Sequence, residues 1–260
     1  MEDAIEKFNV FGGVEWGNID TSKPVFELIE KLILEDYNYI RNDITELTGG
    51  MPLYHTILTG IALGDGKTHT AYKRANISKE VGDKAVDELC EIGIIKMRKS
   101  KKSSPKLYFN SPFLRFWFAF VSPLFKGIKD GDFKEIKERF ENRKDEFINL
   151  TFTQLSQEYL RLSLKDKGLL ECGSYWDDKN GFDIYAKTKD KKIIVGSTKY
   201  TNSKIKKTTL TKLQQTAKDM EIEADIFVIF SKKGFSSELK SLKNDKLKLY
   251  TIKNLKNMVE

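Results

Sequence analysis

The sequence predicts an α+β or α/β protein in which helices and a winged helix-turn-helix come first and a mixed sheet flanked by helices follows. The first observation is a run of three short helices and a two-stranded hairpin between residues 54 and 108. The second is a change after about residue 150 to the order helix, strand, strand, strand, helix, strand. The third is a composition of 40% hydrophobic and 12% aromatic residues over 260 residues, which is enough to form packed cores.

Residues 1–50 are predicted to be a helical N-terminal segment. A helix over residues 22–48 is expected because apolar residues recur at helical spacing after Ser22 and Pro24, which favour a helix start. The residues that set this spacing are Val25, Leu28, Ile29, Leu32 and Ile33. The sequence "GGMP" ends the segment, and "FGGVEW" near its beginning is interpreted as a structural turn.

Residues 51–111 fit a winged helix-turn-helix. "LYHTILTGIALG" predicts a helix that ends at Gly64, "THTAYKRAN" a second helix, and "SKEVGDKAVDELCEIGII" a third. The apolar face of the third helix is expected to consist of Val81, Ala85, Leu89 and Ile92. A strand, a basic turn rich in serine and a second strand then form the wing.

The third helix and the wing are the parts of such a module that contact DNA. The helix would expose Lys79 and Lys84, with Asp83 close to them. The wing would present basic side chains to phosphates, namely Lys96, Arg98, Lys99, Lys101, Lys102 and Lys106. The alternative is a winged helix that contacts only protein and whose basic hairpin is solvated.

Residues 112–148 are predicted to be an aromatic-rich helical linker that ends in the amphipathic helix "FKEIKERFENRKDEFI". Its aromatic residues are expected in a core rather than on a surface that stacks on bases, and they are Phe113, Phe116, Trp117, Phe118, Phe120 and Phe125. Residues 149–260 are predicted to form the sheet domain. Its strands are expected at "LLECGSYW", "GFDIYAK", "KIIVGSTKY", "ADIFVIFS" and "KLKLYT", with helices at "LTFTQLSQEYLRLSL", at "LTKLQQTAKDM" and at the end of the chain.

The net charge of +7 favours a polyanionic partner and does not distinguish DNA, RNA and an anionic membrane surface. The alternative is a solvated, lysine-rich surface. Cys90 and Cys172 have neither zinc-site spacing nor a disulfide framework, so a reducing cytoplasmic location is expected. The N-terminus lacks the apolar region of a secretion signal, and "SPFLRFWFAFVSPLF" is too short to span a bilayer.

Two motifs that resemble ligand sites are interpreted as structural. "GDGKT" lacks the glycine of a phosphate-binding loop, because that position is Ile61, and we expect a turn between two helices. The histidines His55 and His69 have no acid or cysteine partner at metal spacing, so neither is expected to bind a metal. The sequence therefore predicts no cofactor.

A different pattern appears in "GFDIYAKTKDKKIIVGSTKY", residues 181–200. An aspartate on one strand and an acid–x–lysine triplet on the next are typical of metal-dependent nucleases. Here Asp183 is followed by Ser197-Thr198-Lys199, in which serine stands at the position of the acid.

The order of motifs resembles the C-terminal half of the archaeal-type P-loop ATPases found in archaea and bacteria. The shared marks are "FGGVEW", "LYHTILTGIALG", "LCEIGII", "LYFNSPFLRFWFAFVSPL", "GSYWDDKNGFDIYA", "IIVGSTKY" and "FSKKGFSSEL". The resemblance implies a winged helix followed by a restriction-endonuclease-like, PD-(D/E)XK domain. It also implies that the ATPase module is missing, because "FGGVEW" lies just after the ATPase lid in that family.

The same resemblance implies that the nuclease-like site is degenerate. The family pattern places acids at Thr153, at or near Gly181 and at Ser197, while Asp183 and Lys199 stay in place. Because Mg²⁺ is usually held by carboxylates and substrate phosphate, no metal site is expected. Relocated acids at Glu158, Glu171, Asp177 or Asp178 are the alternative.

The leading expectation is a non-catalytic DNA-binding protein that uses the winged helix and the degenerate domain. The degenerate domain would add phosphate contacts through basic residues after its third strand, namely Lys204, Lys206, Lys207 and Lys212. One alternative is a protein-interaction module for an ATPase supplied in trans. The other is a metal-dependent DNA nuclease with a relocated acid. The sequence does not indicate the oligomeric state.

Overall fold

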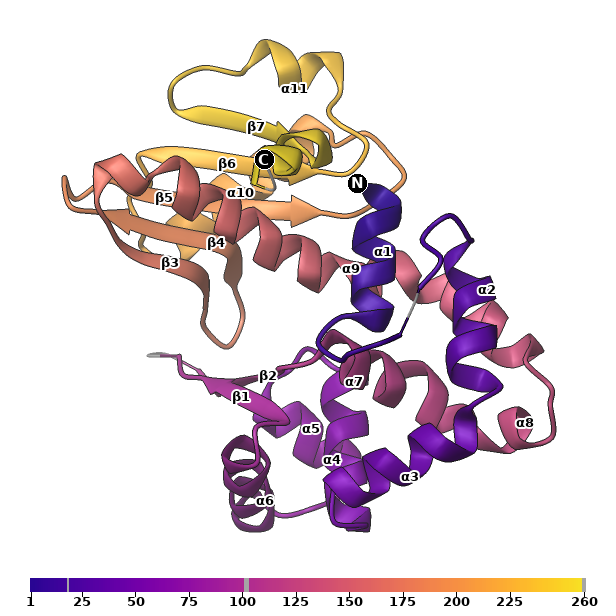
Figure 1. Cartoon of the computed structure of the whole chain (residues 1–260). Coiled ribbons are helices and arrows are strands. Elements are labelled where there is room, and N and C mark those ends of the chain that lie inside the picture. The colour runs from indigo at the N-terminus through magenta and orange to yellow at the C-terminus, as the bar shows by residue number, and fades with distance from the viewer. Residues whose placement is uncertain (18, 101–102, 259–260) are drawn as a thin grey trace. The chain divides into compact units, whose positions relative to one another are not determined.

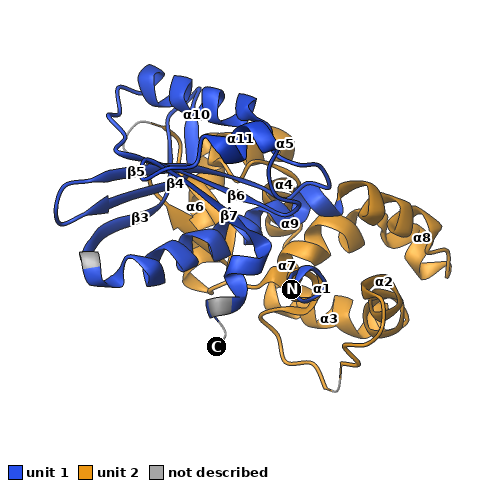
Figure 2. Cartoon of the chain, turned by 90° about the horizontal axis from the view of Figure 1, so that it is seen from above, with its two compact units in different colours: residues 1–5, 144–260 blue, residues 6–143 orange. Residues whose placement is uncertain are grey.

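The structure is a computed structural model, and it describes residues 1–17, 19–100 and 103–258 (Figure 1). The chain folds into two compact units, one of residues 6–143 and the other of residues 1–5 and 144–260 (Figure 2). The predicted boundary between residues 148 and 149 falls inside the helix α9 (Lys134–Ser163). The division into four parts stays a prediction.

The unit of residues 6–143 is mostly helical. Its elements are α2 (Val25–Ile29), the π-helix η1 (Glu30–Leu34), α3 (Tyr37–Leu47), α4 (Pro52–Leu63), α5 (Thr68–Ala75), α6 (Lys79–Glu91), β1 (Ile95–Arg98), β2 (Lys106–Phe109), α7 (Pro112–Phe116), the π-helix η2 (Trp117–Val121), the 3₁₀-helix η3 (Ser122–Leu124) and α8 (Phe125–Lys129). The helix α1 (Glu2–Phe11), which was not predicted, has residues in both units.

The single helix predicted over residues 22–48 is wrong. A π-turn closes with a hydrogen bond from the N–H of Glu35 to the carbonyl of Glu30, and the chain then turns before α3 begins. Asp36 leaves the helical region at φ −92° and ψ 16°, at the position before a helix where aspartate is favoured. Apolar spacing continues through the break, which is why the sequence pattern did not show it.

The three helices and the hairpin of residues 51–111 are confirmed. Asn76 ends α5 in the left-handed region, and the Ser78 hydroxyl begins α6 by accepting a hydrogen bond from the N–H of Val81 at 3.3 Å. β1 and β2 pair antiparallel, from Ile95 with Phe109 to Arg98 with Lys106. The sequence "GDGKT" forms the turn from α4 to α5, as predicted.

The predicted apolar face of α6 is partly wrong. Val81 and Ile92 are 45% and 49% exposed. The buried face consists of Gly82, Ala85, Val86 and Leu89. Glycine fits at position 82 because the ring of Tyr72 lies only 2.6 Å from where a Cβ atom would stand. Ala85 and Leu89 belong to both the predicted and the observed face, whereas Gly82 and Val86 are buried in place of Val81 and Ile92.

The aromatic run after β2 lies in a core, as predicted, apart from its last member. Phe116, Trp117, Phe118 and Phe120 are all buried. Phe125 is 41% exposed, which contradicts the prediction. It begins α8 after the 3₁₀-turn that contains Pro123, and its side chain lines an open pocket instead of a core.

The second unit contains a five-stranded mixed sheet in the order β3-β4-β5-β6-β7. Its strands are β3 (Leu169–Trp176), β4 (Gly181–Thr188), β5 (Ile193–Lys199), β6 (Ile226–Ser231) and β7 (Leu247–Thr251). Its helices besides α9 are the 3₁₀-helix η4 (Lys165–Lys167), α10 (Lys207–Asp219), α11 (Ser237–Ser241) and the 3₁₀-helix η5 (Ile252–Met258). The chain turns back tightly between β3, β4 and β5, whereas β5, β6 and β7 are parallel and need crossovers.

Helices cover both faces of this sheet, which confirms the predicted fold class (Figure 1). α10 packs on the face that carries Val195 and Ile229. α9 packs on the other face, where Tyr159 contacts the rings of Phe230 and Tyr250. The two helices predicted near residues 133–164 are one helix of 30 residues, because neither glycine nor proline interrupts it. None of the described helices is long and apolar enough to cross a membrane.

Candidate nucleic-acid interface

The sheet brings Asp183 next to Ser197. β4 begins at Gly181 and runs antiparallel to β5, which ends at Lys199, so the start of one strand lies beside the end of the other. The Oδ2 atom of Asp183 accepts hydrogen bonds from the Ser197 hydroxyl at 3.1 Å and from the N–H of Thr198 at 2.8 Å. The position where the resemblance implies a second carboxylate therefore supplies a hydrogen-bond donor.

A β-bulge shapes the strand at this point. Asp183 and Ile184 of β4 together oppose one residue of β3, Ser174. The backbone carbonyl of Asp183 accepts hydrogen bonds from Gln157 Nε2 at 2.7 Å and from the Ser174 hydroxyl at 3.1 Å. Gln157 is buried on α9, so a helix side chain fixes the bulge. Gln157 was not among the predicted site residues, because a glutamine on an amphipathic helix gives no signal of its own.

Thr153 lies close to β5, but next to Thr198 rather than Ser197. Its hydroxyl is 2.5 Å from the Thr198 hydroxyl and donates to the carbonyl of Asn149 at 2.8 Å. Strand side chains alternate between faces, so Thr198 points toward α9 while Ser197 and Lys199 point to the other face. The predicted positions of lost acids are therefore not gathered at one point.

Gly181 is also a poor position for an acid in this structure. A Cβ atom there would lie 3.1 Å from the carbonyl oxygen of Tyr175 and from the Cβ atom of Trp176. Mg²⁺ takes near-octahedral oxygen ligands and is usually held by one or two carboxylates together with substrate phosphate. Asp183, whose Oδ2 atom already accepts two hydrogen bonds, and the neutral Ser197 hydroxyl do not fit such an ion.

Two of the four acids that were candidates for relocation have other partners. Glu158 is exposed and pairs with Arg161 at 2.6 Å. Asp177 accepts the N–H groups of Lys179 and Asn180 in the turn between β3 and β4. Glu171 and Asp178 are exposed. Within the described part of the chain, no three His, Cys, Asp or Glu side chains form a group that could hold a metal ion.

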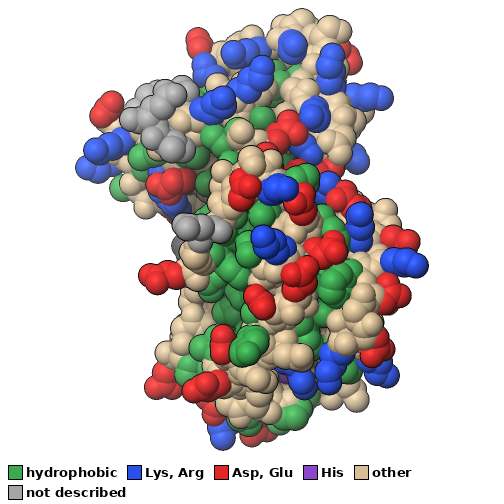
Figure 3. Space-filling view, turned by 45° about the vertical axis from the view of Figure 1, so that its right-hand side comes forward, with side chains coloured by type: hydrophobic (Ala, Val, Ile, Leu, Met, Phe, Trp, Pro, Cys, Tyr) green, Lys and Arg blue, Asp and Glu red, His purple; other side chains and the backbone are tan. Residues whose placement is uncertain are grey.

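Positive charge gathers where β5 ends. Lys199 is half-buried, and Lys204 and Lys206 follow it in exposed positions before α10. Within the described residues, the ammonium groups of these three lysines make no hydrogen bond or ion pair. Lys207 pairs with Glu238 at 3.4 Å. The carboxyl ends of parallel strands are a common place for ligands in open sheets. Lys and Arg side chains crowd the face of this unit that Figure 3 shows.

The wing is the second basic region. Lys96 and Lys99 are exposed, and Arg98 and Lys106 are half-buried. Lys101 and Lys102 lie outside the described residues. These four basic side chains give the hairpin a positive surface that suits phosphate contacts.

The charge of α6 does not suit a helix that enters a DNA groove. Lys84 is exposed, and Lys79 pairs with Asp83 at 2.8 Å. The helix carries two lysines and five acids. The acids are Glu80, Asp83, Asp87, Glu88 and Glu91. A helix with this excess of acids would be repelled by the phosphates on both sides of the groove.

Asp83 is part of the packing of α6 on α5. It accepts hydrogen bonds from Lys79 and, at 3.0 Å, from the Tyr72 hydroxyl. The Lys79 hydrogen bond is the main cause that lowers the pKa of Asp83, and Asp83 in turn raises the pKa of Lys79. Burial, followed by the Asp83 hydrogen bond, raises the pKa of Tyr72. The Lys79 ammonium is therefore engaged within the protein.

Comparison with known proteins supports part of the resemblance. Residues 117–212 match the family model DUF234, described as archaeal and bacterial proteins of unknown function. The match runs from η2 into α10, and it includes Asp183, Ser197 and Lys199 but not the winged helix. The searches of curated proteins and of solved structures found no match.

Proposed function

We propose that this protein binds nucleic acid, with duplex DNA as the expected form, and does not cleave it. The observation that carries the proposal is the group of Lys199, Lys204 and Lys206 at the carboxyl end of β5. Their ammonium groups have no acidic partner within the described residues, so they are available to phosphates. The basic wing would add a second set of backbone contacts.

The absence of cleavage follows from the neighbours of Lys199. A nuclease of the implied kind uses carboxylates and a divalent cation to activate water and to stabilise charge on phosphate. Asp183 instead accepts hydrogen bonds from Ser197 and Thr198. Losing one group aimed at the transition state lowers a rate by about 10²- to 10³-fold. With serine in place of a second carboxylate, the protein also repels a phosphate less, which favours binding without reaction.

The salt dependence of DNA binding tests this proposal. The wild-type protein is expected to bind duplex DNA with an affinity that falls steeply as salt increases. The triple substitution Lys199→Gln, Lys204→Gln and Lys206→Gln should reduce the slope of log Kobs against log salt by up to about 3, because each phosphate contact contributes about 0.9. Gel shifts or fluorescence anisotropy at several salt concentrations give the slope.

A matched control lies at the other end of the same hairpin. Lys189, Lys191 and Lys192 are exposed in the turn between β4 and β5, and their replacement by glutamine makes the same change in net charge. This control should keep the wild-type slope. An equal loss in both triple variants would contradict a site at the end of β5, and no salt-sensitive binding by the wild-type protein would refute the proposal.

A second candidate function is a protein-interaction module for an ATPase supplied in trans. The specific observation is a pocket of about 500 Å³ in the unit of residues 6–143, next to the exposed apolar side chains of Val14, Leu47 and Ile92. Exposed apolar groups that surround a pocket are typical of protein contacts. The acidic α6 also suits a protein partner better than DNA.

Substitution of an exposed apolar residue separates the two functions. Ile92→Asp should abolish recovery of an ATPase in a pull-down, since a charge would be placed in an apolar contact, while DNA binding stays unchanged. The readout is ATP hydrolysis in the recovered fraction. Ile92→Met is the control, because it keeps an apolar side chain of similar size. Equal recovery with Ile92→Asp and wild type would exclude this surface.

A further inference from the structure

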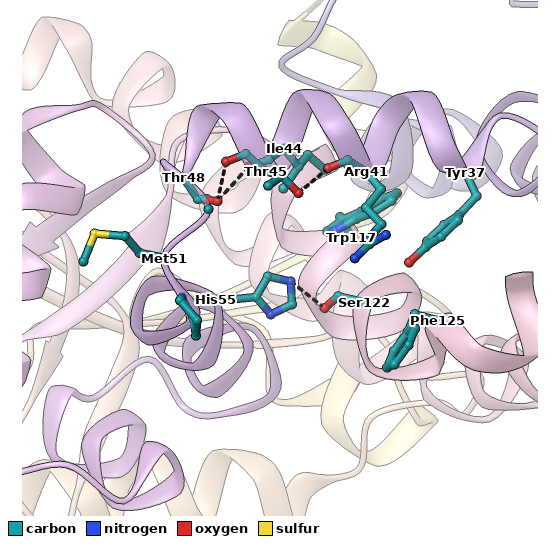
Figure 4. A pocket seen from close by; sticks show the side chains of 12 residues that line it. Tyr37, Arg41, Ile44, Thr45, Thr48, Met51, His55, Trp117, Ser122 and Phe125 are labelled. Carbon is teal, nitrogen blue, oxygen red and sulfur yellow. Dashed lines mark hydrogen bonds between the residues drawn. The ribbon is translucent and has the colours of Figure 1, made fainter.

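A pocket of about 270 Å³ lies in the unit of residues 6–143, between α3, the start of α4 and the segment from η2 to α8 (Figure 4). Its apolar wall is formed by Ile44, Met51, Pro52, Trp117 and Phe125. The ring of Tyr37 stacks on that of Trp117, with 5.6 Å between their centroids and 11° between their planes. The volume is just below the usual range of about 300–1,000 Å³ for drug-sized ligands, so it suits a smaller molecule.

The π-helix η2 shapes one side of the pocket. The N–H of Ser122 donates to the carbonyl of Trp117, five residues earlier, so the turn is wider than in an α-helix. Both residues line the pocket as a result. Single π-turns are rare and occur frequently at functional sites.

Arg41 supplies the charge. It points from α3 into the pocket, on the side of Tyr37 and Ser122 (Figure 4). Its guanidinium makes no hydrogen bond or ion pair within the described part of the chain, and no Asp or Glu is among the residues described as lining the pocket. Burial raises the pKa of Tyr37, and the positive charge of Arg41 offsets part of that rise.

His55 and Ser122 supply further hydrogen-bond donors in the same pocket. His55 Nε2 lies 3.1 Å from the Ser122 hydroxyl, and the His55 ring packs edge-on against Phe118. If the serine donates to Nε2, the N–H on Nδ1 stays available, and if Nε2–H donates, the serine proton stays available. Burial of part of the ring lowers the pKa of His55, and the positive charge of Arg41 lowers it further, although His55 is exposed at the surface.

We propose that this pocket binds a small molecule with a planar apolar body and one oxyanion group, a carboxylate or a phosphate ester, that pairs with Arg41. Guanidinium groups bind both oxyanions through two parallel hydrogen bonds. Trp117 and Phe125 form the wall for the apolar body. A cationic ligand would be repelled by Arg41. A serine nucleophile at Ser122 would need an acid that orients His55, and the described lining residues contain none.

Nuclear magnetic resonance of the full chain tests the proposal, because the protein has two histidines and each can be followed separately. The probes share one ring and differ in the head group: benzoate, phenyl phosphate and the uncharged benzamide. An anion is expected to shift the His55 signals and leave those of His69 unchanged, with a Kd on the order of 1 mM for so small a molecule. The bound anion should also raise the pKa of His55, because negative charge favours the imidazolium.

Variants of Arg41 separate a specific site from general anion binding. Arg41→Gln is expected to weaken binding about 10- to 100-fold, because a charge-assisted pair is lost. Arg41→Lys should keep part of the affinity. The control Arg139→Gln makes the same charge change outside the pocket and should bind as wild type.

The head groups then identify the class of ligand. Binding of benzoate alone would assign a carboxylate site, and binding of phenyl phosphate alone a phosphate site. Three results would overturn the proposal: equal binding of benzamide, equal binding by Arg41→Gln and wild type, or no shift of the His55 signals with either anion. These results do not depend on DNA binding, so the two proposals can fail separately.

Discussion

Replacement of Lys232 by alanine is expected to destabilise the sheet unit more than any nearby surface change. The Lys232 side chain is 4% exposed, and its Nζ atom lies 2.9 Å from Asp145 Oδ1 and 4.3 Å from the centre of the Tyr200 ring. Without the Lys232 ammonium, Asp145 keeps the hydrogen bond that Asn202 donates to its Oδ2 atom. We expect a loss of about 2–4 kcal/mol in the free energy of unfolding, somewhat less than for a fully buried pair because Asp145 is 30% exposed.

The neighbouring lysine is the control for this prediction. Lys233 pairs with Glu2 at 3.2 Å but is 43% exposed, so Lys233→Ala should change the free energy of unfolding by less than about 1 kcal/mol. Urea unfolding followed by circular dichroism measures both. A double-mutant cycle of Lys232→Ala with Asp145→Ala should give a coupling of about 1–3 kcal/mol. Equal effects of the two lysine variants would contradict a stabilising role for the buried pair.

The elements that the sequence predicted well are those whose signals are local. The three helices and the hairpin of residues 51–111 have turn residues at their ends, such as Ser78 and Asn76, and the strands β3 to β7 are short apolar runs between turns. The errors concern contacts between elements. They are the break before α3 and the exposed positions of Val81, Ile92 and Phe125. Each depends on which other element packs against that residue, and the apolar spacing of one segment does not show this.

The same distinction applies to the candidate site. Asp183 and Ser197 are close, as their place on two adjacent strands joined by a turn implied. The roles of Gln157 and of the bulge depend on how α9 packs on the sheet. Lys232 follows an apolar strand together with Lys233, and nothing in the two adjacent lysines shows which one is buried.

The substitution Ser197→Glu is expected to create a weak divalent-cation site. It would place a second carboxylate next to Asp183 and remove the hydroxyl that donates to it at 3.1 Å. In the absence of metal, the like charges and the lost hydrogen bond should lower the free energy of unfolding by about 1–3 kcal/mol. Two carboxylates suit Mg²⁺ or Mn²⁺, so Mn²⁺ at ten times its Kd should restore about 1.4 kcal/mol.

Urea unfolding with and without Mn²⁺ measures this recovery, and Ser197→Gln is the matched control. Glutamine has the size of glutamate without its charge, so that variant and the wild type should not respond to Mn²⁺. Stabilisation of Ser197→Glu alone would mean that the strands can hold two carboxylates at a distance that one cation can bridge. A carboxylate at position 197 would then be what this sheet lacks for a metal site. Loss of stability without recovery would mean that the bulge fixed by Gln157 holds Asp183 too far from that position for a shared cation.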